Sequence, residues 1–336
     1  MRLPPGKIPK EILESVIFKN LGVKRNEVVL GPLVGFDAAI INAGGKSIVV
    51  SVDPITGALE RIGWLAVNVN ANDVATFGVE PTFFLSCILL PEKAESGIIE
   101  TISVQMDRAA KALEMAIVGG HCETTPGLAS PIVVGCAMGI ANRGKYVVSG
   151  GAKAGDKIVL TKSVGIEGTA ILASDRKQQL VKVLGPETLR RAEKFYERIS
   201  VVKDAIIAFR TGAVHAMHDP TEGGLAGGVH EMADAANLGV RILEEKIHIE
   251  PETAKICDFF RIDPLQLIAS GSLLIAVEGD SADKVLKALD RNSVKASVIG
   301  EFVLSPKQRL ITHRNGKVEK LARPVTDHLW QALDKP

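Results

Sequence analysis

The sequence predicts an α/β (α+β) fold divided into two domains. Apolar segments of strand length alternate with amphipathic segments of helix length along most of its 336 residues, which is the pattern of proteins that pack helices on sheets. This length exceeds that of one ordinary domain. The glycine-rich stretch 141–156, ANRGKYVVSGGAKAGD, has few large apolar side chains and is typical of a domain boundary. We predict an N-terminal domain at residues 1–145 and a C-terminal domain at residues 155–336.

Local signals predict the elements of the first half. Pro9 stands near the start of a helix expected at 9–21, where apolar residues recur at helical spacing. The turn residues Ala43-Gly44-Gly45 indicate a hairpin. A long amphipathic helix is expected at 95–115. Strands are expected at 28–30, 38–42, 46–52, 82–90, 116–119 and 132–140.

The second half repeats the alternation of strands and helices. A last hairpin is expected at 310–320, because Asn315-Gly316 favours a tight turn. Strands are expected at 157–161, 213–217, 240–243, 272–277 and 296–304, and helices in the region up to 209 and at 221–236, 251–260 and 281–291.

The rest of the chain is organised around Gly57–Pro81, GALERIGWLAVNVNANDVATFGVEP, which reads as a helix with glycine and proline at its ends. Asn68, Asn70, Asn72 and Asp73 interrupt its apolar stripe, although such side chains disfavour a helix interior. Two interpretations remain open at this point. The four residues form a solvated helix face, or the helix carries oxygen ligands toward a charged cofactor.

Composition excludes several classes of protein. Hydrophobic residues make up 46% and charged residues 24% of the chain, as in soluble globular proteins. A net charge of +1 and 4% aromatic residues give no basis for binding nucleic acid or a membrane surface. The four cysteines include no CxxC pair, and no apolar run has the length of a membrane span. A cytoplasmic protein is expected.

An acidic set suggests a metal site. Asp37, Asp53 and Asp73 lie with Asn72 at or near the ends of predicted elements. Mg²⁺ prefers oxygen ligands, usually one or two carboxylates together with phosphate oxygens. Each aspartate alone is equally well explained as a turn or cap residue. Only as a set do they predict Mg²⁺ bound to a nucleotide.

Two glycine-rich segments add to this set. GGHCETTPG at Gly119–Gly127 is expected to be a polar binding loop, and zinc is disfavoured because no second Cys/His pair stands at zinc spacing. In HAMHDPTEGGLAGG, Asp219, Pro220 and Glu222 resemble the cap and first turn of a helix. The glycines that follow weaken that helix, which predicts close approach of an anion to its amino end. The chain has no GxxxxGK[ST], GxGxxG or GxSxG motif.

These residues, in this order, resemble the aminoimidazole ribonucleotide (AIR) synthetase, or PurM-like, superfamily, and most of all its hydrogenase expression/formation (HypE) branch. The stretches that carry the resemblance are GFDAAII, SVDP, NDVATFGVEP, GGHCETTPG, VSGGAKAGDKIVLTKSVGIEGTAIL, DPTEGGLAGGVHEMADAANLGVRI and DPLQLIASGSLLIAV. The resemblance implies a two-domain fold and a homodimer whose N-terminal domains pair into a β-barrel. It also implies ATP and Mg²⁺ as cofactors, and phosphorylation of an amide-type or acyl oxygen.

The resemblance also implies roles for individual residues. Asp37, Asp73 and Asp219 would be catalytic, and Asp37, Asp53 and Asp73 would hold the metal. The cofactor-binding residues would be Asn72, Gly119, Gly120, His121, Glu123, Lys162, Thr221, Gly223 and Gly224.

The sequence departs from the family pattern in three places. The hydrogenase factor ends in a cysteine that carries the reacting carbamoyl group, whereas the last cysteine here is Cys257, so no reaction on the chain's own tail is expected. The start, RLPPGKIPKEIL, replaces the family's glycine-rich segment. Phe36 and His121 stand where the family has acidic residues.

These observations predict an ATP-dependent enzyme that acts on a small-molecule or protein-borne amide substrate. An alternative is a non-catalytic HypE-like paralogue that binds nucleotide or a maturation-factor partner. A third possibility is phosphoribosylformylglycinamidine cyclo-ligase, which the DPTEGGLA stretch disfavours.

Overall fold

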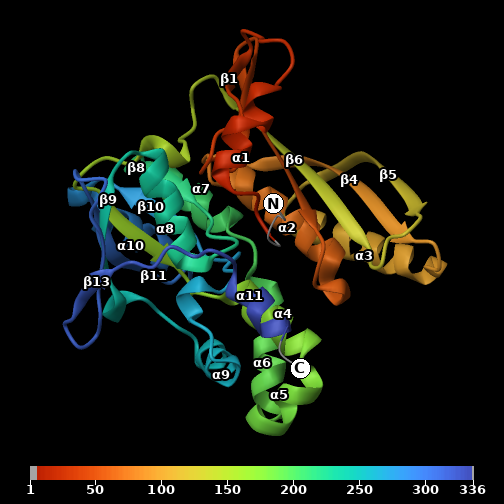
Figure 1. Ribbon diagram of the computed structural model, residues 1–336. Helices are drawn as coiled ribbons and strands as arrows, with labels where there is room; N and C mark the ends of the chain where they lie inside the picture. The colour runs from red at the N-terminus through yellow and green to blue at the C-terminus, as the bar shows by residue number, and fades with distance from the viewer. Residues whose placement is uncertain (1–5, 335–336) are drawn as a thin grey trace.

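The computed structural model describes residues 6–334, and over this range the chain forms two mixed units, each built on one sheet (Figure 1). The ends of the two predicted domains, residues 1–5 and 335–336, lie outside the described residues. The first sheet has the strand order β1-β2-β3-β6-β4-β5, and the second has the order β13-β12-β9-β11-β7-β10-β8. The predicted α/β (α+β) class is therefore confirmed.

The first sheet is antiparallel except at one edge, where β5 runs parallel to β4. Its face toward the helices buries alternate residues, such as Ser47, Val49 and Ser51 of β3, while the opposite face carries half-exposed apolar side chains. Its strands are β1 Val28–Leu30, β2 Ala39–Ala43, β3 Lys46–Ile55, β4 Pro81–Pro91, β5 Ala116–Thr125 and β6 Ile132–Asn142.

Helix α2 (Ile62–Ala75) lies at the centre of the molecule. It packs on the first sheet beside α3 (Ser96–Ala112) and also contacts the second unit (Figure 1). Leu65 and Val69 of α2 share a hydrophobic core with residues of the second unit such as Ile166 and Leu189. Because both sides of α2 are covered, every residue from Leu65 to Ala75 is buried.

The second unit places helices on both faces of its sheet, with separate hydrophobic clusters. Its strands are β7 Lys157–Thr161, β8 Val214–His218, β9 Gly239–Leu243, β10 Leu274–Val277, β11 Ala296–Val303, β12 Arg309–Thr312 and β13 Val318–Lys320. Its helices are α4 Ile166–Asp175, α5 Lys177–Leu184, α6 Pro186–Glu193, α7 Val202–Arg210, α8 Gly224–Ala235, α9 Pro251–Phe260, α10 Ala282–Arg291 and α11 His328–Leu333.

Most predicted elements are present, and the differences have local causes. The predicted helix at 9–21 is the short α1 (Lys10–Ser15) followed by a 3₁₀ turn, because few of its side chains have a core to pack against. The predicted hairpin at 310–320 is confirmed, and Gly316 adopts φ 82° in its turn. No helix within residues 6–334 is long and apolar enough to cross a membrane.

Candidate functional site

Four aspartates from different elements of the two units converge at the seam between them. Asp37 precedes β2, Asp53 lies within β3, Asp73 lies near the end of α2, and Asp219 follows β8. Oxygens of Asp37 and Asp219 lie within 4.8 Å of each other, and the Ser51 hydroxyl contacts both the main-chain carbonyl of Asp37 and Asp73 Oδ2. The charges of Asp53, Asp219 and Asp37 all act on Asp73, and those of Asp37 and Asp53 act on Asp219. The acidic set predicted from the sequence is thus brought together, and Asp219 joins it.

Crowding and burial make these carboxyl groups hard to ionise together. Burial raises the pKa of Asp53 to about 6, with Lys7 opposing the shift and Asp37 adding to it. Burial also raises the pKa of Asp73 and of Asp219 well above the ordinary aspartate value, and the neighbouring acids add to both shifts. A divalent cation would relieve this repulsion, because carboxylate oxygens are the ligands that hard cations prefer.

Asp219 is the least satisfied member of the set. Only 1% of the residue is exposed, and neither of its carboxylate oxygens has a hydrogen-bond partner. A buried polar group without a partner is costly and needs an explanation. One oxygen of Asp37, one oxygen of Asp219 and one ring nitrogen of His218 all lie within 4.8 Å of one another. The donor set therefore fits a cation bound between the aspartates.

His218 is engaged by carboxylates on both sides of its ring. Its Nδ1 lies 2.8 Å from Asp37 Oδ1, and its Nε2 lies 2.9 Å from Glu231 Oε2. Burial lowers the pKa of His218, but the charges of Asp37 and Glu231 and the hydrogen bonds to them outweigh this effect and raise it to about 10. A protonated ring donates from both nitrogens and has no lone pair for a metal. We assign His218 to holding Asp37 in place.

The N-terminal segment reaches the same site. The main-chain nitrogen of Lys7 donates to Glu222 Oε2 at 2.8 Å, and its Nζ pairs with Glu231 at 3.2 Å. Its side chain remains 54% exposed. Sequence reasoning missed Lys7 and Glu231 as residues of this site, and it gave Glu222 only a capping role. The charge of Glu222 nevertheless acts on Asp53.

The polar residues of α2 are buried, so of the two interpretations left open by the sequence the solvated helix face is wrong. Asn70 accepts a hydrogen bond from the main-chain nitrogen of Asp53 at 2.8 Å, and the hydroxyl of Ser51 lies 2.6 Å from Asp73 Oδ2. These contacts fix α2 on β3. A Cβ atom at Gly135 of β6 would lie 2.4 Å from Asn70 Nδ2, so this close approach requires glycine.

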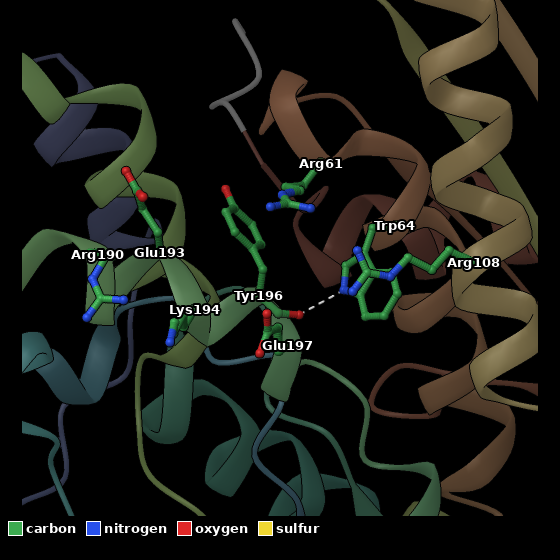
Figure 2. A pocket seen from close by; sticks show the side chains of 8 residues that line it. All are labelled: Arg61, Trp64, Arg108, Arg190, Glu193, Lys194, Tyr196 and Glu197. Atoms are coloured by element: carbon green, nitrogen blue, oxygen red, sulfur yellow. Dashed lines mark hydrogen bonds between the residues drawn. The ribbon is translucent and has the colours of Figure 1, made fainter.

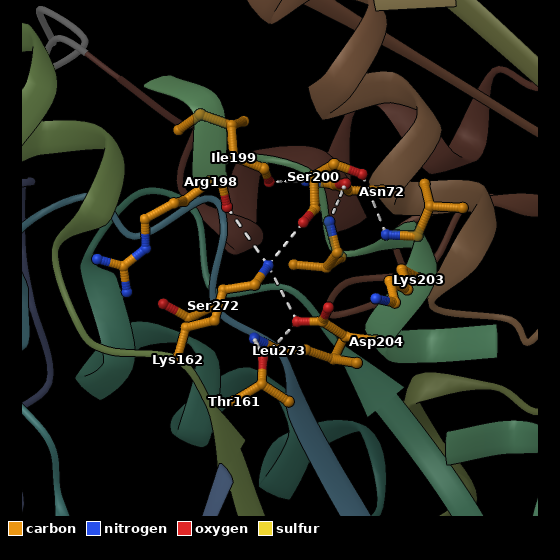
Figure 3. Close-up of polar contacts among 12 residues, drawn as sticks. Asn72, Thr161, Lys162, Arg198, Ile199, Ser200, Lys203, Asp204, Ser272 and Leu273 are labelled. Carbon is orange, nitrogen blue, oxygen red and sulfur yellow. Dashed lines mark hydrogen bonds and ion pairs between the residues drawn. The ribbon is translucent and has the colours of Figure 1, made fainter. Parts of the chain in front are cut away.

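Asn72 is directed away from the aspartates. Its Nδ2 donates to the carbonyl of Ile199 at 2.9 Å, and its Oδ1 accepts from the main-chain nitrogen of Val201 at 2.8 Å (Figure 3). It therefore ties α2 to the second unit. Of the polar residues on this helix, Asp73 takes part in the acidic cluster directly and Asn70 supports it through Asp53.

Lys162 lies in a buried network beside Asn72 (Figure 3). Its Nζ donates to the carbonyl of Ser200 at 2.6 Å and of Arg198 at 3.3 Å, and it pairs with Asp204 at 3.0 Å. These three contacts use the three donors of an ammonium group. The structure thus places Lys162 within the protein network, and none of its contacts is with the four aspartates.

The segment Gly119–Gly127 is mostly strand, so the prediction of a loop here is wrong, while the role of its residues in binding the nucleotide stays a prediction. Gly119, Gly120, His121 and Glu123 all belong to β5, which pairs along β4. His121 Nε2 lies 3.1 Å from Glu123 Oε2, and both side chains are exposed. A Cβ at Gly120 would lie 2.2 Å from the carbonyl oxygen of Ser86, so the neighbouring strand explains this glycine.

The predicted helix start at Asp219 is also wrong. Thr221 lies in the loop before α8, which begins at Gly224 with Gly223 as its cap at φ 81°. Gly223 donates its main-chain N–H to Asp327 at 2.6 Å. A Cβ at Gly224 would lie 2.5 Å from the carbonyl oxygen of Leu267. The glycines accommodate neighbouring protein groups, so they do not by themselves indicate an anion.

Glu167, in the first turn of α4, is a buried acid that sequence reasoning did not identify. It is 4% exposed and its Oε2 has no hydrogen-bond partner. Burial raises its pKa to about 7, with the Ser270 hydroxyl opposing the shift and Asp327 adding to it. The folded protein therefore holds this proton more tightly than the unfolded chain. The resulting stabilisation is complete below the ordinary glutamate value and is lost as the pH rises toward 7.

We expect Glu167→Gln to remove this pH dependence. Relative to the variant, the wild type should lose up to about 3 kcal/mol of unfolding free energy between pH 4.5 and pH 8. Urea unfolding of both proteins across this range measures the difference. Glu92→Gln, at an exposed glutamate that forms no ion pair with the described residues, is the matched control. Parallel stability curves for wild type and Glu167→Gln would contradict the assignment.

Comparison with known proteins identifies matches over most of the chain. Two family models match: AIR synthase related protein, N-terminal domain, at residues 35–141, and AIR synthase related protein, C-terminal domain, at residues 153–313. A putative hydrogenase expression/formation protein of Methanocaldococcus jannaschii is 32% identical over 306 residues, covering 88% of each chain. Carbamoyl dehydratase HypE of Rhizobium leguminosarum is 28% identical, covering 80% of this chain and 77% of the relative.

Solved structures show the same fold. A HypE–HypF complex aligns with a TM-score of 0.77 and 23% identity, covering 93% of this chain and 99% of the other. HypE in complex with ATP aligns with a TM-score of 0.70 and 21% identity, covering 98% of both chains. Thiamine monophosphate kinase from Aquifex aeolicus aligns with a TM-score of 0.70 and 19% identity, covering 96% of this chain and 100% of the other.

Proposed function

The chain belongs to the AIR synthase related family, and on that premise we propose that it is an ATP-dependent enzyme that phosphorylates an amide-type or acyl oxygen. One observation carries the proposal. Asp37, Asp53, Asp73 and Asp219 converge at the seam of the two units, and Asp219 is buried without a partner. Such a group of carboxylates suits Mg²⁺ on a nucleotide better than a purely structural role.

The proposed reaction has two steps. The amide oxygen attacks the γ-phosphorus of ATP, an oxygen–phosphorus bond forms, and the bond to the bridging oxygen breaks, so that ADP leaves with that electron pair. The nitrogen of a primary amide loses one proton on phosphorylation; in the second step the carbon–oxygen bond breaks, phosphate leaves with that electron pair, and the nitrogen loses its other proton to solvent as the carbon–nitrogen triple bond forms. Phosphorylation converts a poor leaving group into a good one.

The aspartates would hold the metal in this scheme. Asp37, Asp53, Asp73 and Asp219 supply the oxygen ligands, and bound Mg²⁺ would neutralise phosphate charge. His218 and Ser51 orient Asp37 and Asp73 through hydrogen bonds, so these two side chains keep one geometry. Fixed positions matter, because phosphoryl transfer depends chiefly on positioning and charge neutralisation.

The relatives support this chemistry and suggest its setting. One structure of similar fold is HypE in complex with ATP, and a sequence relative is carbamoyl dehydratase HypE. We propose a role in hydrogenase maturation, with a protein-borne amide as substrate. A structure of similar fold, HypE in complex with HypF, supports a maturation-factor partner as well.

Calorimetry with ATP, with and without Mg²⁺, tests the proposal, and phosphate release is then followed in the same sample. Mg²⁺-dependent binding with slow hydrolysis that amide compounds accelerate is the expected result. Binding without hydrolysis, whatever amide is added, would instead favour a non-catalytic paralogue. Phe36, which stands beside Asp37 in place of a family acid, is the observation that favours this second candidate. Absence of Mg-ATP binding would contradict the enzyme and a nucleotide-binding paralogue, and would leave a paralogue that binds a protein partner.

We also propose that the chain forms a homodimer through its first sheet. The face of this sheet opposite α2 and α3 carries apolar side chains, and β5 leaves its outer edge unpaired with the described residues. On this open face Val52 is 60% exposed and Ile140 is 48% exposed. Large exposed apolar patches of this kind mark interaction surfaces.

Met138→Glu should separate the proposed dimer. Met138 lies on β6 in register with Val50 and Phe83, near the middle of the open face. A buried charge without a partner there would oppose association. Light scattering coupled to gel filtration should give the mass of two chains for the wild type and of one chain for the variant. Val183→Glu, at an exposed valine of α5, should leave the mass unchanged. A wild type with the mass of one chain would contradict the dimer.

A further inference from the structure

Apart from the aspartate cluster, a polar cavity lies at the seam of the two units, at the amino end of α2 (Figure 2). Its volume is about 170 Å³. The first unit contributes residues from the start of α2 and from α3, and the second contributes residues from α6 and the 3₁₀ turn after it. The lining residues are Arg61, Trp64, Arg108, Arg190, Glu193, Lys194, Tyr196 and Glu197.

Positive charge in this cavity is only partly balanced. Arg190 pairs with Glu187, and Glu193 pairs with Lys177. Within residues 6–334, however, Arg61, Arg108 and Lys194 form no ion pair with any carboxylate, and Glu197 is the one unpaired acid on the wall. These three cations come from both units and face one small space. A bound anion would relieve their repulsion.

Aromatic rings hold the two unpaired guanidinium groups. Arg61 lies over the ring of Tyr196, with its Cζ 6.0 Å from the ring centre, and Arg108 lies over the ring of Trp64 at 5.6 Å. The indole of Trp64 in turn donates to the carbonyl oxygen of Tyr196 at 2.8 Å, across the seam (Figure 2). Stacking restrains a guanidinium while leaving the N–H groups on its edge free for bidentate bonds to an oxyanion.

The cavity is separate from the aspartate cluster. Trp64 and Asp73 are nine residues apart on α2, which corresponds to about 13 Å along a helix. Trp64 and Asn68, one turn apart, face the second unit, whereas Asp73 faces β3. The two sites also have opposite charge, so a free anion is repelled by one and attracted by the other.

We propose that this cavity binds the phosphate group of a small ligand. Its volume of about 170 Å³ is ample for a phosphate group. Three unpaired cations against one unpaired acid favour a dianion over a carboxylate. The phosphate would contact both units and so stabilise the interface between them, next to the hydrogen bond between Trp64 and Tyr196.

Titration of the full chain with inorganic phosphate in EDTA, without nucleotide, tests this site. Chelation removes any metal that could bring phosphate to the aspartates. We expect saturable binding and a higher midpoint of thermal unfolding with phosphate, since a ligand of the folded state stabilises it. Arg61→Gln combined with Arg108→Gln should weaken binding about tenfold or more, because each charged hydrogen bond contributes strongly. Sodium acetate at equal ionic strength should bind much more weakly.

Two controls and one milder variant keep the result interpretable. Arg291→Gln, at an exposed arginine on α10 that forms no ion pair with the described residues, should leave phosphate affinity unchanged. Asp73→Asn should also leave it unchanged, so failure of the aspartate site and failure of this site are distinguishable. Lys194→Gln is a milder variant should the double variant unfold. Equal phosphate affinity in wild type and folded variants, or no saturation of the wild type, would overturn the proposal.

Discussion

Replacing Asp219 by asparagine is expected to lower Mg-ATP turnover at least about 100-fold, which corresponds to about 2.7 kcal/mol of transition-state stabilisation. The side chain is buried, has an oxygen within 4.8 Å of an Asp37 oxygen and of a His218 ring nitrogen, and uses neither oxygen in a hydrogen bond within the described protein. Loss of one charged ligand would weaken the neutralisation of phosphate charge on which phosphoryl transfer depends. Steady-state phosphate release measures the effect.

The same substitution should not destabilise the metal-free protein. A buried carboxylate without partners is a cost to folding, and a neutral amide in its place costs less. Thermal unfolding in EDTA should therefore give an equal or higher midpoint for Asp219→Asn. Asp283→Asn, at an exposed aspartate of α10, is the control and should change neither measurement. Wild-type turnover in a folded Asp219→Asn protein would refute the assignment of this residue to the site.

Lys162→Met should destabilise the fold by about 3–5 kcal/mol, because it removes the partner of a buried charge. Asp204 is 3% exposed, so its carboxylate would remain in the interior with only the hydroxyl of Thr161 as a neighbour. The carbonyls of Arg198 and Ser200 would also lose their donor. Chemical denaturation of wild type and variant gives the difference in unfolding free energy.

A double variant separates the ion pair from the other contacts of Lys162. Lys162→Met with Asp204→Asn should recover part of the lost stability, because it leaves no unpaired charge. Lys203→Met, at an exposed lysine that donates only to the carbonyl of Asn292, should cost far less. Mg-ATP affinity of the folded Lys162→Met protein tests the cofactor-binding role that the sequence predicted. Reduced affinity at unchanged stability would restore that role.

The acidic residues of the site were predictable from sequence because a carboxylate at an element end is a local feature. Asp37, Asp53 and Asp73 were identified in this way, and the family resemblance added Asp219. The residues that hold them were not predictable. His218 bonds to Asp37 across 181 residues of sequence, and Lys7 pairs with Glu231 across 224. No local pattern encodes a contact at such separation.

The wrong predictions have the same origin. The polar residues of α2 left a solvated helix face open as an interpretation, yet a second unit covers that side, and main-chain groups of Asp53, Ile199 and Val201 satisfy Asn70 and Asn72. The glycines of β5 and of the α8 start favoured a ligand, yet the carbonyl oxygens of Ser86 and Leu267 approach them. In each case a neighbouring segment of the protein occupies the place that the sequence assigned to solvent or ligand.

The fold class, most elements and the family could be predicted from local patterns, because hydrophobic spacing, turn residues and motifs act over short stretches of chain. The contacts among polar residues depended instead on how the two units pack. In the folded protein four aspartates from two units lie together, and Asp219 has no hydrogen-bond partner. Lys162 and Asn72 make contacts within the protein instead. Three unpaired cations line a cavity at the other end of α2. The physical reason is that burial and charge depend on neighbours in space, which the packing of the two units on α2 supplies.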